Sequence, residues 1–97
     1  MIKTRIHIDV VCEDGAYGFT WEGLLPCALR KGDIISFCNQ DGCSCEDDSG
    51  VCGIVIDHVP IFDAENKVLK CYPEVRWQEV TMVKALLHYT KLGFIPD

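Results

Sequence analysis

Residues 2–12 read Ile-Lys-Thr-Arg-Ile-His-Ile-Asp-Val-Val-Cys, and the side chains alternate between two kinds. The even positions are largely apolar, and the odd positions, His7 among them, are largely charged or polar. A repeat of two is the spacing at which successive strand residues face opposite sides of a sheet. The stretch therefore predicts a long strand with one face in a hydrophobic core and the other in water.

The chain that follows predicts a hairpin. Residues 13–18 contain an Asp-Gly pair, which suits the positive φ angles of tight turns, and a second apolar run begins at Phe19. Pro26 ends that run because proline donates no hydrogen bond to a neighbouring strand. We therefore expect an antiparallel partner strand at Phe19–Leu25.

Short Ile- and Val-rich runs predict three further strands, at Ile34–Cys38, Val51–Val59 and Val68–Tyr72. The run at Val51–Val59 is nearly continuous in Ile and Val, so we expect a central strand covered on both faces.

The last part of the chain has helical spacing. Residues 79–92 place apolar side chains at positions that share one helix face, and leave three basic residues for the opposite face. Gly93 suits the residue after the helix end, where Phe94 would pack back on Tyr89. The expected inward set is Val80, Val83, Leu86, Leu87 and Leu92, and the expected outward set is Lys84, His88 and Lys91.

Together these elements predict one α+β domain spanning residues 1–97. We expect a small curved or barrel-like antiparallel sheet of about five strands with one C-terminal helix. The composition agrees, because 48% of the residues are hydrophobic and 25% are charged, as in ordinary globular domains.

The charge of the chain argues against several partners. A net charge of -6 repels a phosphate backbone, so we expect no nucleic-acid binding. Charged residues are scattered through the first nine positions, which predicts neither a signal peptide nor a membrane anchor. We expect a soluble, cytoplasmic protein.

A polar insert at residues 39–50 carries the densest chemistry in the chain. Four of its residues are acidic and two are cysteines. A cluster of carboxylates attracts basic groups, so the insert predicts an interaction surface for a protein partner. The acidic residues of this surface are Asp41, Glu46, Asp47 and Asp48.

The cysteines of this region suggest a zinc site as an alternative. Cys43 and Cys45 are followed by Cys52 seven residues later, and thiolates at such spacing share one zinc ion tetrahedrally, with Cys38 or His58 as the fourth ligand. The lone Cys-x-Cys pair departs from the usual two pairs of structural zinc sites. Neighbouring carboxylates should also raise the thiol pKa values, which disfavours a thiol enzyme but leaves reversible oxidation open.

Catalytic patterns are scarce. Asp57 and His58 are adjacent in a predicted strand and should point to opposite faces. We therefore expect a non-catalytic protein-interaction domain with no cofactor. The alternatives are a zinc-binding or thiol-based accessory protein, and a small-ligand barrel lined by Trp21, Phe37 and Tyr72. An unprotected sheet edge would also permit a homodimer.

Overall fold

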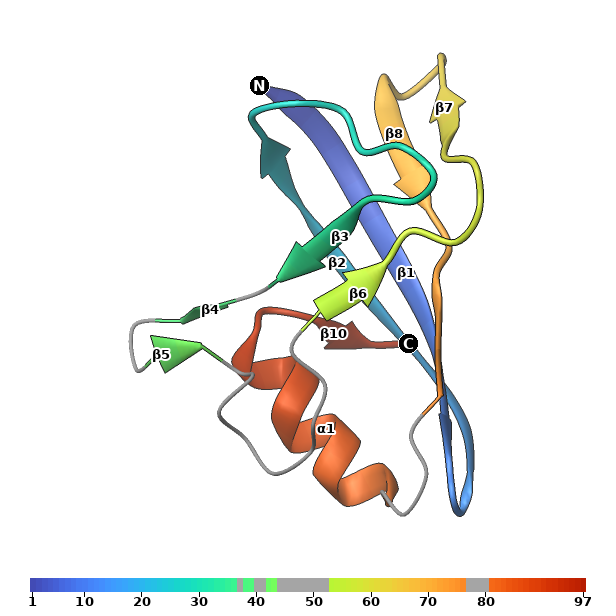
Figure 1. Cartoon of the computed structure of the whole chain (residues 1–97), viewed down its shortest axis with the longest axis vertical. Coiled ribbons are helices and arrows are strands. Elements are labelled where there is room, and N and C mark those ends of the chain that lie inside the picture. The colour runs from blue at the N-terminus through green and yellow to red at the C-terminus, as the bar shows by residue number, and fades with distance from the viewer. Residues whose placement is uncertain (37, 40–41, 44–52, 77–80) are drawn as a thin grey trace.

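The computed structural model describes residues 1–36, 38–39, 42–43, 53–76 and 81–97. These residues form a six-stranded mixed sheet, two short two-stranded ribbons and one C-terminal helix (Figure 1). The elements are β1 (Ile2–Cys12), β2 (Gly15–Leu25), β3 (Ile34–Ser36), β4 (Cys38–Asn39), β5 (Gly42–Cys43), β6 (Gly53–Val55), β7 (Ile61–Asp63), β8 (Val68–Cys71), β9 (Glu74–Arg76), α1 (Met82–Lys91) and β10 (Ile95–Pro96).

The predicted hairpin forms the centre of the sheet. β1 pairs with β2 along its whole length, from Ile2 opposite Leu25 to Cys12 opposite Gly15. β2 begins earlier than its predicted start at Phe19, because only two residues make the turn and Gly15 adopts a φ of 145°. The register places the odd residues of β1 on the outer face of the sheet, where His7 lies opposite Thr20.

The sheet is mixed, with strand order β10-β2-β1-β8-β7 and β9 also paired with β1. The α+β class with one C-terminal helix is confirmed, but the sheet is neither antiparallel throughout nor closed. β8 and β9 run parallel to β1, because the chain crosses over through β3, β6 and β7 before it returns. Pro73 separates β8 from β9, and its carbonyl accepts a hydrogen bond from the Asp9 N–H at 3.2 Å.

β3 and β6 form a ribbon that packs one face against the core. Ile34 pairs with Val55 and Ile35 with Ile54. Ile54 and Ile56 are buried, whereas Val55 is 51% exposed. The expectation of a central strand over Val51–Val59, covered on both faces, is therefore wrong. β6 ends at Val55, and only the face that carries Ile54 is buried. Residues 51–52 lie outside the described part.

The rotation of α1 differs from the prediction. Val83 and Leu87 are each 64% exposed, whereas His88 is only 6% exposed. The cause is an aromatic cluster in which Tyr89 contacts Phe19 and Phe94, with ring centroids 5.3 and 5.4 Å apart. Burying Tyr89 turns the neighbouring position inward, so the ring of His88 lies edge-on against Tyr89 at 5.0 Å.

The predicted helix end is confirmed. The N–H of Gly93 donates to the Thr90 carbonyl at 3.2 Å, and the N–H of Phe94 donates to the Tyr89 carbonyl at 3.0 Å. Gly93 has a φ of 98°, a backbone conformation that side chains with a Cβ rarely adopt. Of the expected helix 79–92, residues 79–80 lie outside the described part.

Substitution of Gly93 tests this cap. Gly93→Ala should lower the free energy of unfolding by about 1 kcal/mol or more, and Tm by roughly 5 °C, because alanine is strained at this φ. Thermal unfolding followed by circular dichroism measures the change. Lys84→Ala, at an exposed helix position, is the control and should leave Tm nearly unchanged. Equal Tm values for the two variants would contradict the role assigned to Gly93.

Candidate functional site

The predicted cysteine and acidic sites fall largely outside the described residues. Cys45, Cys52 and all four acidic residues of the predicted interaction surface (Asp41, Glu46, Asp47 and Asp48) lie there. Cys43 belongs to β5, where its backbone is the register partner of Cys38 in β4. The pairing places these two positions opposite each other, and the zinc hypothesis stays a prediction.

His58, the remaining predicted ligand, is engaged by its neighbour. Its Nδ1 lies 2.8 Å from Asp57 Oδ1, and its side chain is 70% exposed. The expectation that the two side chains point apart is wrong, because the strand ends at Val55 and the chain bends at His58. Partial burial raises the pKa of Asp57, but hydrogen bonds from His58 and from backbone N–H groups outweigh it and hold the pKa below its ordinary value.

A second cluster on the outer face of the main sheet was not predicted. His7 Nδ1 lies 3.0 Å from Thr20 Oγ1 and 3.1 Å from Asp97 Oδ2. Thr20 Oγ1 in turn donates a hydrogen bond to Asp97 Oδ1 at 2.8 Å. Gly18 leaves room for this arrangement, because a Cβ there would stand 2.5 Å from Asp97 Oδ2.

The bonds among His7, Thr20 and Asp97 hold the chain in place at residue 97, and we call these three residues the clamp. Hydroxyl, imidazole and carboxylate groups also make up a nucleophilic triad, but there the hydroxyl and the carboxylate bind opposite nitrogens of the imidazole. Here the Thr20 hydroxyl and the Asp97 carboxylate both lie beside Nδ1 of His7, and the hydroxyl donates its hydrogen bond to the carboxylate. The clamp instead fixes residue 97, whose N–H also donates to the Gly18 carbonyl at 3.0 Å, beside the β10–β2 pairing.

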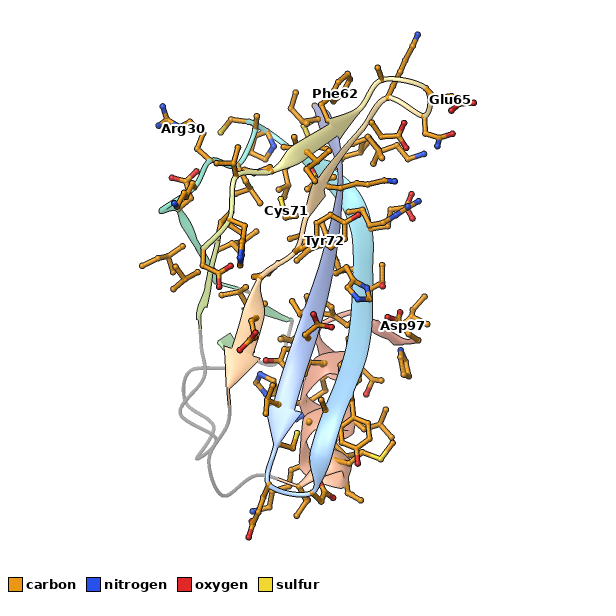
Figure 2. All side chains as sticks on the ribbon, turned by 90° about the vertical axis from the view of Figure 1, so that its right-hand side faces the viewer. Arg30, Phe62, Glu65, Cys71, Tyr72 and Asp97 are labelled. Carbon is orange, nitrogen blue, oxygen red and sulfur yellow. The ribbon has the colours of Figure 1, made fainter. Side chains whose placement is uncertain are left out.

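Two ion pairs lie near the clamp on the outer face. Glu22 pairs with Lys3 at 3.7 Å and with Arg5 at 3.5 Å. Exposed ion pairs of this kind contribute little to stability, but they keep the surface hydrated. Tyr72 lies beside His7 on this face, with ring centroids 6.1 Å apart (Figure 2). Trp21 packs against the core on the opposite face, so the structure does not bring these two proposed barrel-lining residues together.

Five exposed apolar side chains lie on the ribbon and on the segment from Val55 to the end of β7, where the adjacent Ile61 and Phe62 face opposite sides of the sheet. Ile34 and Val55 are register partners on the ribbon, and three more large apolar residues follow between Val55 and the end of β7. All five are more than half exposed. We call this set the ribbon–edge surface: Ile34 (68% exposed), Val55 (51%), Val59 (71%), Ile61 (59%) and Phe62 (60%).

Sequence reasoning missed this surface for a physical reason. An Ile- and Val-rich run has the same composition whether it fills a core or faces water, so hydrophobicity alone does not reveal its exposure. Pro60 was the available signal, because it ends strand pairing within the run and favours a position near the margin of the sheet.

Removal of the Asp97 carboxylate tests the clamp. Asp97→Ala should raise the amide exchange rates of residues 94–97 by about 3- to 10-fold, because it removes the bonds to Thr20 and His7. Hydrogen exchange followed by mass spectrometry measures the rates. Asp9→Ala is the matched control, since that carboxylate lies 3.7 Å from His7 Nε2, does not reach residue 97 in the described part of the chain, and is 68% exposed. Equal exchange in both variants would show that Asp97 holds nothing in place.

Two searches within the described residues gave negative results. No group of three or more His, Cys, Asp or Glu side chains there could hold a metal ion. No helix in the same residues has the length and apolar character needed to cross a membrane. Comparison of the chain with protein-family models, with curated proteins and with solved structures found no match.

Proposed function

We propose that this chain is a non-catalytic domain that binds another protein through the ribbon–edge surface. The observation that carries the proposal is the exposure of its five large apolar side chains, each between 51% and 71%. Covering apolar surface is favourable by about 25 cal/mol per Å² removed from water. Exposed apolar residues gathered on neighbouring segments mark interaction sites more often than scattered ones do.

The backbone beneath part of this surface is well ordered by hydrogen bonds. Ile56 N–H donates to the Asp33 carbonyl at 2.8 Å, and Gly32 N–H donates to the Ile56 carbonyl at 2.8 Å. Asp33 also accepts a hydrogen bond from the Arg30 N–H at 2.8 Å through its side chain. A surface held in this way loses little conformational entropy when a partner binds, which favours affinity.

The non-catalytic part of the proposal rests on the two described clusters that contain His7 and His58. Each imidazole has its Nδ1 engaged by an aspartate, and the Thr20 hydroxyl beside His7 directs its proton to Asp97. These bonds suit structural support better than proton transfer to a substrate.

The charge distribution bears on the partner. All nine basic residues lie in the described part of the chain, together with ten of the fifteen acidic ones. The remaining acidic residues include Asp41, Glu46, Asp47 and Asp48 of the insert. We therefore expect a protein partner that carries both apolar and basic residues, and neither a nucleic acid nor a membrane.

A substitution on the ribbon tests the proposal. Val55→Glu should abolish the capture of partner proteins by the immobilised chain, because a carboxylate in an apolar interface loses its hydration. Captured proteins are compared by quantitative mass spectrometry. Leu24→Glu is the control, since Leu24 is 58% exposed but lies on β2 and does not belong to the ribbon–edge surface. This variant should capture the same proteins as the wild type. Folding of both variants is checked by circular dichroism, and unchanged capture by Val55→Glu would refute the proposal.

A zinc-binding accessory protein is the second candidate, favoured by the register pairing of Cys38 with Cys43. Cys43, Cys45 and Cys52 would supply thiolates, and His58 or Cys38 the fourth ligand.

Metal content distinguishes the two candidates. In the zinc candidate, protein purified without chelator should contain about one zinc per chain by elemental mass spectrometry. Cys43→Ser should then lower Tm sharply, because metal binding contributes to folding. Thiols that titrate freely in a metal-free sample, with Tm unchanged in the variant, would exclude this candidate. Cys27→Ser, at an exposed cysteine outside the polar insert, is the control.

A further inference from the structure

The pairing of β4 with β5 places two cysteines opposite each other. Cys38 is the register partner of Cys43, and Asn39 is that of Gly42. Only positions 40 and 41 separate the two strands, which Figure 1 shows side by side beyond the end of β3. The two cysteines are therefore brought together by a backbone pairing and not only by their nearness in sequence.

The kind of pairing fixes the distance between the two backbones. When two residues connect antiparallel strands, the pair next to the connection exchanges hydrogen bonds and the following pair does not. Cys38 and Cys43 are the second pair. The Cα atoms of a pair without hydrogen bonds lie about 4.5 Å apart, and those of a disulfide lie about 4.4–6.8 Å apart. The register therefore meets the backbone distance of a disulfide without rearrangement of the strands.

We propose that Cys38 and Cys43 are a site of reversible oxidation, at which a disulfide forms between β4 and β5. The inference goes beyond the proposed function and does not depend on it. One cysteine thiolate attacks a small-molecule disulfide, which leaves a mixed disulfide and releases one small-molecule thiolate. The second cysteine thiolate attacks the protein sulfur of the mixed disulfide and releases the other. The two protein thiols lose two protons and two electrons, and the small-molecule disulfide is reduced to two thiols.

Other described cysteines are less suited to this reaction. Cys12 is 7% and Cys71 1% exposed, and burial raises the pKa of both thiols. A buried thiol with a raised pKa reacts slowly with an oxidant. Cys12 pairs with Gly15 in the sheet and Cys71 with Ile6. Within the described residues, the strand register therefore opposes two cysteines only in the β4–β5 pair.

The disulfide and the zinc candidate exclude each other in one molecule. Oxidation of Cys43 removes a thiolate that every form of the zinc site requires. It also closes a covalent ring over residues 38–43, two positions after the end of β3. The state of this pair therefore decides between a metal-binding and a cross-linked form of the chain.

Peptide mapping of the full chain tests the proposal. The oxidant is bis(2-hydroxyethyl) disulfide, a neutral molecule that a chain of net charge -6 does not repel. The reaction is run at about pH 8.5, where an ordinary thiol is half ionised, and free thiols are then alkylated in denaturant. Cleavage before Asp33, Asp41 and Asp47 separates the two cysteines into peptides 33–40 and 41–46.

Mass spectrometry of the unreduced digest should find these two peptides joined through Cys43, with Cys12 and Cys71 alkylated. Cys45→Ser is the matched control, because it removes the other cysteine of peptide 41–46 and should leave the linked fraction unchanged. Cys43→Ser should lower that fraction about fivefold or more, because the register no longer opposes two thiols. Alkylated Cys38 and Cys43 in the oxidised wild type, or equal linked fractions in the two variants, would overturn the proposal.

Oxidation of the unfolded chain measures what the strand pairing contributes. The same reaction in a denaturing concentration of guanidinium chloride should give about a fivefold or smaller linked fraction relative to the folded chain, because the register that holds the two thiols together is lost. An equal fraction in both conditions would show that nearness in sequence is sufficient, and would overturn the role assigned to the β4–β5 pairing.

Discussion

Everything in this fold depends on the burial of β1 between two paired edges. Ile6, Ile8 and Val10 are fully buried on its inner face, while β2 occupies one edge and β8 and β9 the other. The inner side chains belong to the same cluster as residues of the ribbon, the helix and the C-terminal segment. A fully buried apolar side chain contributes about 1.5–3 kcal/mol, so this strand alone provides a large part of a small domain's net stability.

The two faces of β1 differ in the groups that they carry. The inner face fills the core, and the outer face is occupied by ion pairs and by the clamp of His7, Thr20 and Asp97. Exposed apolar groups lie on the ribbon and on β7, and also on β2 and α1. The ribbon and β7 are each flanked by hydrogen bonds, at Asp33 and at Asp63.

Several features of the fold and site are not set by neighbouring residues alone. Helical spacing places His88 on the face expected to meet solvent, yet the packing of Tyr89 on Phe19 and Phe94 turns His88 inward. Asp57 contacts His58 because the strand stops two residues earlier, where pairing with β3 ends. The clamp joins residues separated by up to 90 positions, from His7 to Asp97, and no local pattern encodes such a meeting.

The sequence by itself determined what depends on near neighbours. The alternation of residues 2–12 defined β1, the Asp-Gly pair marked its turn, and Gly93 ended α1, because strand period, turn geometry and left-handed backbone are local properties. Only the tertiary structure decided the parallel return of β8 and β9, the rotation of α1 and the exposure of Val55 and Phe62. These features follow from which surfaces meet across the chain, and the apolar character of a residue does not specify what will cover it.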